Sequence, residues 1–137
     1  MSETILLPGG RDARGTLDAA SENVDRPVDA TRSTTACVVA CPPHPQHGGH
    51  RGDQRLRAVS EELNEGGTDC LRFDYGPWDG GRGERTDVES AVAWANERYD
   101  RVGLFGFSFG GALALSAAAH GADVAGVAAL APPASLG

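Results

Sequence analysis

The sequence predicts an α/β protein, a three-layer α/β/α sandwich around a mostly parallel sheet that begins with an antiparallel hairpin. Short apolar segments alternate with helix-length segments from residue 35 to residue 130. The first of these segments, 35–40, is β-branched and shows no polar alternation, as in a strand buried on both faces. The hairpin rests on two short segments, 4–7 and 15–20, separated by Pro-Gly-Gly.

Each further element follows from spacing and end signals. Leu56, Val59 and Leu63 share one helical face, which predicts a helix over 53–64 that ends at two glycines. Thr86 and Glu89 form a T-x-x-E capping box, which predicts a helix from Thr86 to about residue 98. The remaining predictions are strands at 69–75, 101–107 and 123–130, a glycine-rich loop at 76–83 and a helix at 109–120.

Length and charge narrow the class of protein. The 137 residues suit a single domain over 1–137. With 12 basic residues, all arginine, and 19 acidic ones, the chain is acidic at a net charge of −7, which argues against nucleic acid and anionic membranes as partners. No apolar run is long enough to span a membrane, and the N-terminus does not resemble a secretory signal. Three loosely spaced cysteines indicate reduced thiols and a cytoplasmic protein.

In a parallel sheet, functional residues gather at the carboxyl ends of the strands. One such end carries Gly106-Phe107-Ser108-Phe109-Gly110, a G-x-S-x-G pattern between an apolar strand and a helix of small residues. That context predicts a nucleophile elbow: Ser108 is presented on a tight turn, Gly106 and Gly110 avoid clashes, and the Phe109 N–H faces an oxyanion. The alternative is an ordinary turn in which Ser108 caps the helix.

Two other strand ends leave alternatives open. Cys41, His44, His47 and His50 recur every third residue and could hold a metal, although this is not a standard ligand spacing, and His47 and His50 are otherwise solvated loop residues. The acidic side chains near the end of the second parallel strand either line a pocket or cap turns and the next helix. Those acidic side chains are Asp74, Asp79 and Glu84. Trp78 is expected at the pocket mouth, and Trp94 in the packing of the helix.

Four segments together resemble a known family. PPHPQHGG, LRFDYG, GRGE and GFSFGG occur in an order and spacing similar to those of the α/β hydrolases related to dienelactone hydrolase, over about residues 5–133. The resemblance implies hydrolysis of a small-molecule ester, lactone or similar acyl bond through a Ser108 acyl-enzyme, without a metal or organic cofactor. It further implies that the backbone N–H of Gln46 is the second oxyanion donor beside Phe109, and that His44 shapes the loop.

The expected acid and base are missing from this sequence. Serine hydrolysis on this fold needs an acid and then a histidine after the nucleophile, yet Ser108 is followed only by His120 and Asp123, at the wrong ends of their elements. We therefore expect a chain that lacks the last strand–helix units, a catalytically inactive binding or interaction domain, or a second chain that supplies both groups. We also expect self-association through the apolar strand edge at 123–130.

Overall fold

The computed structural model describes residues 2–20 and 33–133. Their strands form one six-stranded sheet with the order β1-β2-β4-β3-β5-β6. β1 pairs antiparallel with β2 and β2 with β4, whereas β4, β3, β5 and β6 run parallel. The strands are β1 (Ser2–Leu6), β2 (Arg14–Asp18), β3 (Ser33–Cys41), β4 (Asp69–Asp74), β5 (Tyr99–Phe107) and β6 (Gly126–Leu130). The predicted hairpin and mostly parallel sheet are confirmed.

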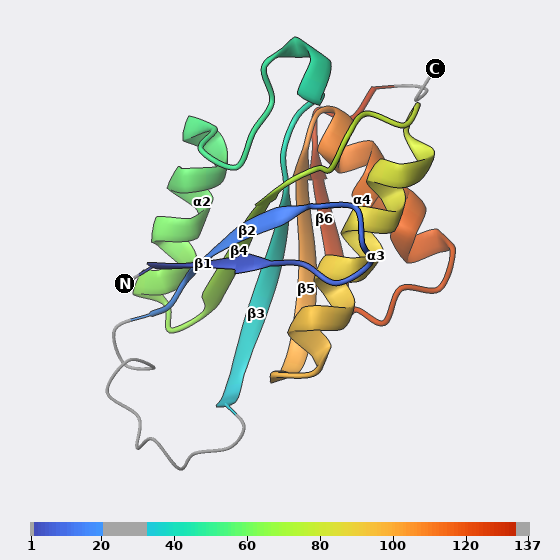
Figure 1. Cartoon of the computed structure of the whole chain (residues 1–137). Coiled ribbons are helices and arrows are strands. Elements are labelled where there is room, and N and C mark those ends of the chain that lie inside the picture. Colours follow the sequence, from blue (N-terminus) through green and yellow to red (C-terminus); the bar gives the residue numbers. More distant parts are fainter. Residues whose placement is uncertain (1, 21–32, 134–137) are drawn as a thin grey trace.

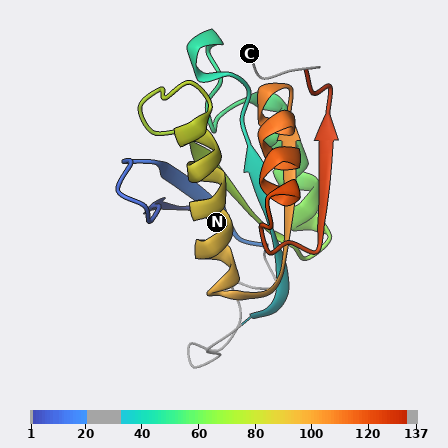
Figure 2. The ribbon, with the colours of Figure 1, turned by 90° about the vertical axis from the view of Figure 1, so that its right-hand side faces the viewer.

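Helices cover both faces of this sheet. α2 (Gln54–Glu65) lies on one face, and α3 (Arg82–Asn96) and α4 (Phe109–Ala119) lie side by side on the other (Figures 1 and 2). A short 3-10 helix, η1 (Pro45–His47), follows β3. The predicted three-layer sandwich is confirmed. Over the described residues, a helix with the length and apolar character needed to cross a bilayer is not found.

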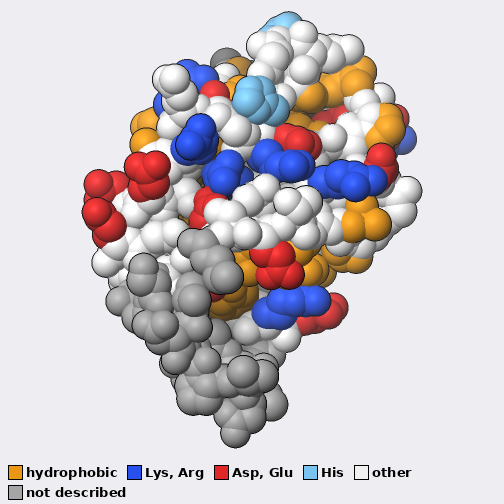
Figure 3. Space-filling view, turned by 60° about the vertical axis from the view of Figure 1, so that its left-hand side comes forward, with side chains coloured by type: hydrophobic (Ala, Val, Ile, Leu, Met, Phe, Trp, Pro, Cys, Tyr) orange, Lys and Arg blue, Asp and Glu red, His pale blue; other side chains and the backbone are white. Residues whose placement is uncertain are grey.

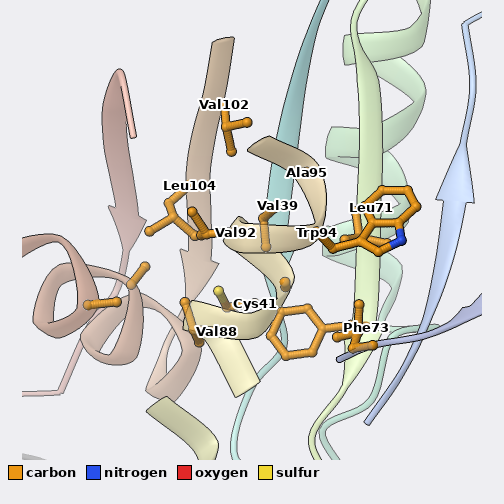
Figure 4. Close-up of a cluster of buried hydrophobic side chains, with 14 of the residues drawn as sticks. Val39, Cys41, Leu71, Phe73, Val88, Val92, Trp94, Ala95, Val102 and Leu104 are labelled. Carbon is orange, nitrogen blue, oxygen red and sulfur yellow. The ribbon is translucent and has the colours of Figure 1, made fainter. Parts of the chain in front are cut away.

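The main core lies between the sheet and the α3–α4 layer. Valines and alanines of α3 pack against inward-facing side chains of β3, β4 and β5 (Figure 4). A much smaller cluster of Ala40, Leu56 and Cys70 lies beneath α2. The three cysteines, Cys37, Cys41 and Cys70, are free thiols and completely buried.

The two helices that follow β3 and β4 begin in different ways. α2 starts as predicted, because the Asp53 carboxylate accepts the N–H groups of Arg55 at 2.8 Å and Leu56 at 3.3 Å. The prediction for α3 is wrong by four residues, since this helix begins at Arg82 and places Thr86 inside it. The reason is Glu84, whose carboxylate reaches back to the Gly81 N–H at 2.7 Å and makes the cap that the Thr86 box was expected to make.

Arginines and carboxylates lie interspersed on the face that carries the N-terminal hairpin (Figure 3). One of these pairs, Arg72 and Asp18, is largely enclosed, with an Nε–Oδ2 distance of 2.6 Å and both side chains 12% exposed. Burial works to raise the pKa of Asp18, but hydrogen bonds from Arg72, Ser2 and Ser60 outweigh it, so this pKa is lowered. The pair therefore joins β2 to β4 as a charged, hydrogen-bonded unit.

Candidate functional site

Three segments far apart in the sequence meet at the carboxyl ends of the parallel strands. Cys41, the last residue of β3, pairs in register with Gly106 of β5. The Tyr75 hydroxyl, just after β4, donates to the carbonyl oxygen of Pro42 at 2.8 Å. The His44 ring lies 4.5 Å from the Phe109 ring, centroid to centroid. The strand ends that the sequence singled out therefore form one site.

Ser108 has an unusual backbone conformation at the turn from β5 to α4. Its φ of 58° and ψ of −120° lie in a region that side chains with a Cβ rarely adopt. The Ser108 N–H donates to the Leu130 carbonyl at 2.8 Å, which ties the turn to β6. A Cβ at position 106 would overlap the Gly110 carbonyl oxygen, and a Cβ at position 110 would overlap that of Cys41. The turn therefore requires glycine at both positions.

The Ser108 hydroxyl is not used as a helix cap. Ser108 occupies the N-cap position of α4, but its side chain makes no capping hydrogen bond. The structure thus disagrees with the alternative in which this serine is present for capping. Phe109 is the first helical residue, and an N–H group at that position has no acceptor within its own helix.

The histidine loop folds back on itself next to this turn. His44 precedes η1, and its Nδ1 accepts the Gln46 N–H at 3.1 Å, so the expected oxyanion donor is bonded within the loop in this structure. A Cβ at Gly49 would overlap the Pro43 carbonyl oxygen, so the loop returns through a position open only to glycine. Burial, and secondly the neighbouring His47, lower the pKa of His44, which favours the neutral ring that can accept this bond.

The residues of the alternative metal site do not converge. The Cys41 side chain is buried in the core among Val39 and Val88, on the sheet face covered by α3 (Figure 4). His44 and His47 stack on each other with ring centroids 4.5 Å apart, and His50 Nδ1 accepts the Gly52 N–H at 3.0 Å. Within residues 2–20 and 33–133, three or more histidine, cysteine or acidic side chains are nowhere grouped as metal ligands.

The acidic residues at and beyond the end of β4 organise loops. Asp74 accepts the Arg51 backbone N–H at 2.6 Å and its guanidinium at 2.8 Å. Glu84, fully buried, accepts the N–H groups of Asp79 at 2.8 Å and Gly81 at 2.7 Å. Of the two roles the sequence left open, capping of turns and helices is the one these contacts show.

Trp94 packs as the sequence predicts, and Trp78 lies beside two aromatic rings of the site. The Trp78 ring is 4.5 Å from His44 and 5.9 Å from Phe109, with 39% of the residue exposed, at the rim of the site. Trp94 packs in the core, with the Arg98 guanidinium 4.2 Å above its ring.

Several solved structures superpose on this chain. An α/β serine hydrolase without a lid from Xanthomonas campestris shares 25% identity at a TM-score of 0.81, covering 98% of this chain and 62% of that one. The chain has the α/β-hydrolase fold. An α/β serine hydrolase homologue from Coxiella burnetii shares 24% identity at a TM-score of 0.76, and the match covers 97% of this chain and 63% of the homologue. A dienelactone hydrolase from Anabaena variabilis shares 22% identity at a TM-score of 0.72, and the match covers 94% of this chain and 62% of that enzyme.

The expected resemblance to the α/β hydrolases is thereby confirmed at the level of the fold. This α/β-hydrolase chain spans less than two thirds of the length of those three neighbours. The sequence matches no family model and no curated protein.

Within the α/β-hydrolase fold, His120 and Asp123 lie away from Ser108. His120 caps α4 at the end opposite to Ser108, about 18 Å away along the helix axis at 1.5 Å per residue. Asp123 precedes β6, which begins at Gly126 rather than at the predicted residue 123, and its carbonyl accepts the Asn96 side chain at 2.9 Å. Neither residue is placed to act on the Ser108 hydroxyl.

Arg11, in the turn between β1 and β2, is a residue near the site that the sequence did not predict. Its Nε donates to Asp87 at 2.9 Å, and its Nη2 donates to the Pro77 carbonyl at 2.8 Å. Hydrogen bonding with Asp87 raises the pKa of this guanidinium. The contacts join residues more than 60 positions apart, so no short pattern in the sequence indicates them.

Proposed function

We propose that this chain carries the nucleophile of an α/β-fold serine hydrolase that acts on an ester, lactone or similar acyl bond. The observation that carries the proposal is the backbone of Ser108, at φ 58° and ψ −120°, together with a hydroxyl that makes no cap bond. A conformation of this kind costs about 1–3 kcal/mol and persists where the surrounding structure enforces it, often at active sites. The G-x-S-x-G turn is in this proposal a nucleophile elbow.

The proposed reaction begins with attack of the Ser108 Oγ on the acyl carbonyl carbon, while a base accepts the hydroxyl proton. The negative oxygen that forms is held by the Phe109 N–H at the positive end of α4. The Gln46 N–H supplies the second hydrogen bond once it leaves His44 Nδ1, so the loop at 44–47 rearranges when substrate binds. The protonated base gives this proton to the leaving alcohol as its bond to the acyl carbon breaks. Water, deprotonated by the same base, then attacks the acyl carbon, and Ser108 Oγ leaves with the proton as the free acid forms. This chemistry needs no metal or organic cofactor.

The base and its acid are assigned to polypeptide beyond the described residues, in the same chain or a second one. This assignment rests on the location of His120 and Asp123 away from Ser108. The same observation favours a second candidate function, a hydrolase-like binding domain without turnover. The three free, buried thiols further support a cytoplasmic location.

A fluorophosphonate probe separates the two functions, because it reacts with a serine that a base activates. The full chain is incubated with the probe, and the modified residue is located by mass spectrometry. Labelling at Ser108 that is abolished in Ser108→Ala and retained in Ser116→Ala supports the hydrolase. Folded protein that stays unlabelled when the polypeptide that supplies the base is present supports the binding domain.

A further inference from the structure

We propose that Arg11 is a positioning residue for the site, because it anchors the 76–81 loop that holds Trp78 against His44 and Phe109. The inference rests on the proposed function, since this loop forms one wall of the site around Ser108. It concerns the turn between β1 and β2, which contributes no residue to the proposed chemistry.

Arg11 makes four hydrogen bonds from a largely enclosed position. Its Nε and Nη2 bind the two carboxylate oxygens of Asp87 at 2.9 and 3.1 Å. Nη2 also reaches Glu84 at 3.3 Å and the carbonyl oxygen of Pro77 at 2.8 Å. The Arg11 side chain is 21% exposed, Asp87 is 2% and Glu84 is 0%. Two buried carboxylates therefore depend on one guanidinium, and a planar fork can bind both at once.

The same carboxylates hold the backbone of the loop. Asp87 accepts the Gly76 N–H at 2.9 Å, and Glu84 accepts the N–H groups of Asp79 at 2.8 Å and Gly81 at 2.7 Å. With the Arg11 bond to the Pro77 carbonyl, four backbone groups of the loop are bound by this ionic cluster. Removal of the guanidinium would leave both carboxylates without their cation, and the loop would lose its anchors together.

Glycines in and next to the loop leave the space that Arg11 occupies, and they would make the loop flexible without Arg11. A Cβ at Gly76 would overlap the Arg11 carbonyl oxygen, and a Cβ at Gly83 would overlap the Arg11 guanidinium. Gly80 and Gly81 adopt φ values of +66° and +98°, and glycines leave a segment with much conformational freedom in the absence of tertiary contacts. Arg11 is therefore the contact that converts a glycine-rich segment into a fixed support for Trp78.

Trp78 reports the position of this loop. In a Trp94→Phe background Trp78 is the only tryptophan, because the sequence has two. We compare Arg11→Met, Arg11→Lys and the control Arg14→Met, which removes an arginine from an ion pair with Asp12 whose side chains are 57% and 69% exposed. The readouts are the emission wavelength of Trp78, its quenching by acrylamide and the far-ultraviolet circular dichroism of the whole chain.

In Arg11→Met we expect a red shift and an increase of about twofold in the quenching constant, as for a loop released into solvent, with an unchanged helix signal. Arg11→Lys should fall in between, because an ammonium cannot bind Asp87 and Pro77 as the fork does. Arg14→Met should match the parent. Parent-like emission and quenching in a folded Arg11→Met overturn the proposal. If Arg11→Met does not fold, parent-like values in a folded Arg11→Lys overturn it instead.

Fluorophosphonate labelling of the same variants separates this inference from the proposed function. If the parent stays unlabelled when the polypeptide that supplies the base is present, but Arg11→Met releases Trp78, the hydrolase proposal fails and the positioning role stands. If the parent is labelled and the emission of Trp78 is unchanged in both Arg11 variants, the positioning role fails and the hydrolase proposal stands.

Discussion

The Tyr75 hydroxyl donates a 2.8 Å hydrogen bond to the carbonyl oxygen of Pro42 and so joins the loop after β4 to the loop after β3. Pro42 is fully buried, so this carbonyl has no access to water if the hydroxyl is removed. The Tyr75 ring also packs edge-on against Phe73 at 5.2 Å and Phe109 at 6.0 Å. One side chain thus connects both loops to the turn that carries Ser108.

Tyr75→Phe should lower the free energy of unfolding by about 1–2 kcal/mol, because a buried carbonyl loses its donor while the ring contacts remain. Urea unfolding followed by circular dichroism measures the difference. A loss below about 0.5 kcal/mol, the size of an ordinary surface change, would contradict the importance assigned to this bond.

Ser108→Gly should be more stable than Ser108→Ala by about 1 kcal/mol, because glycine adopts a positive φ without the strain that a Cβ brings. Both variants lack the hydroxyl, so their comparison isolates the backbone. Ala112→Gly, within α4, is the matched control and should lose roughly 1 kcal/mol instead. Equal urea midpoints for Ser108→Gly and Ser108→Ala would argue against strain at this turn.

Acidification should release the histidine loop. The pKa of His44 is lowered from 6.5, first by burial and then by His47, so the neutral ring favours the folded state. This contribution to stability is fully present above pH 6.5 and is lost as the pH falls through the lowered pKa. Protonation also ends the acceptor role of Nδ1 toward the Gln46 N–H.

Trp78 can follow this titration, because its ring lies 4.5 Å from His44 and a protonated imidazole quenches indole emission. In the Trp94→Phe background, we expect Trp78 emission to fall with a midpoint below pH 6.5. His44→Gln should remove the transition, and His120→Gln should leave it unchanged. A midpoint at or above 6.5 would contradict the lowered pKa.

Self-association through β6 stays a proposal, and the structure supplies its physical basis. β6 is an edge strand of the described sheet, with Val127 38% and Leu130 55% exposed. The sequence has no charged residue after Asp123, so this edge lacks the charges that usually prevent pairing between sheets. We expect the chain to pair through β6 with a second copy.

Val127→Lys should weaken this association at least about tenfold, since a charge on an edge strand opposes pairing. Leu6→Lys is the control, because Leu6 is an equally apolar, 61% exposed residue on β1 at the opposite edge. Sedimentation over a range of concentrations measures both variants. A parent that is monomeric throughout, or equal effects of the two substitutions, would refute the role of β6.

The parallel strands and the start of α2 could be predicted because their signals are local. The β-branched, apolar segment of β3 is typical of a buried strand, and the Asp53 cap acts on the next three residues. The start of α3 could not be predicted in this way. Its cap is Glu84, and the position of that carboxylate depends on Arg11, 73 residues earlier.

The same distinction applies to the site. The turn at Ser108 is set by neighbouring glycines, so its geometry was accessible from the sequence. The bond between the Gln46 N–H and His44 Nδ1 was not, because it depends on the orientation of the His44 ring, which contacts Trp78 in the loop after β4 and Phe109 at the start of α4. Contacts of that kind appear only when the strand ends have been brought together.

Because all three cysteines are buried in the sheet, their reaction with a thiol reagent can report when the sheet opens. Burial raises the pKa of Cys70 to about 12, so at neutral pH this sulfur is a protonated thiol and reacts slowly even where a reagent can reach it. Cys37 lies within β3, Cys41 at its carboxyl end beside Gly106, and Cys70 on β4 opposite Val38. The rate at which a thiol reagent modifies each cysteine of the native protein therefore measures how often that part of β3 or β4 opens transiently.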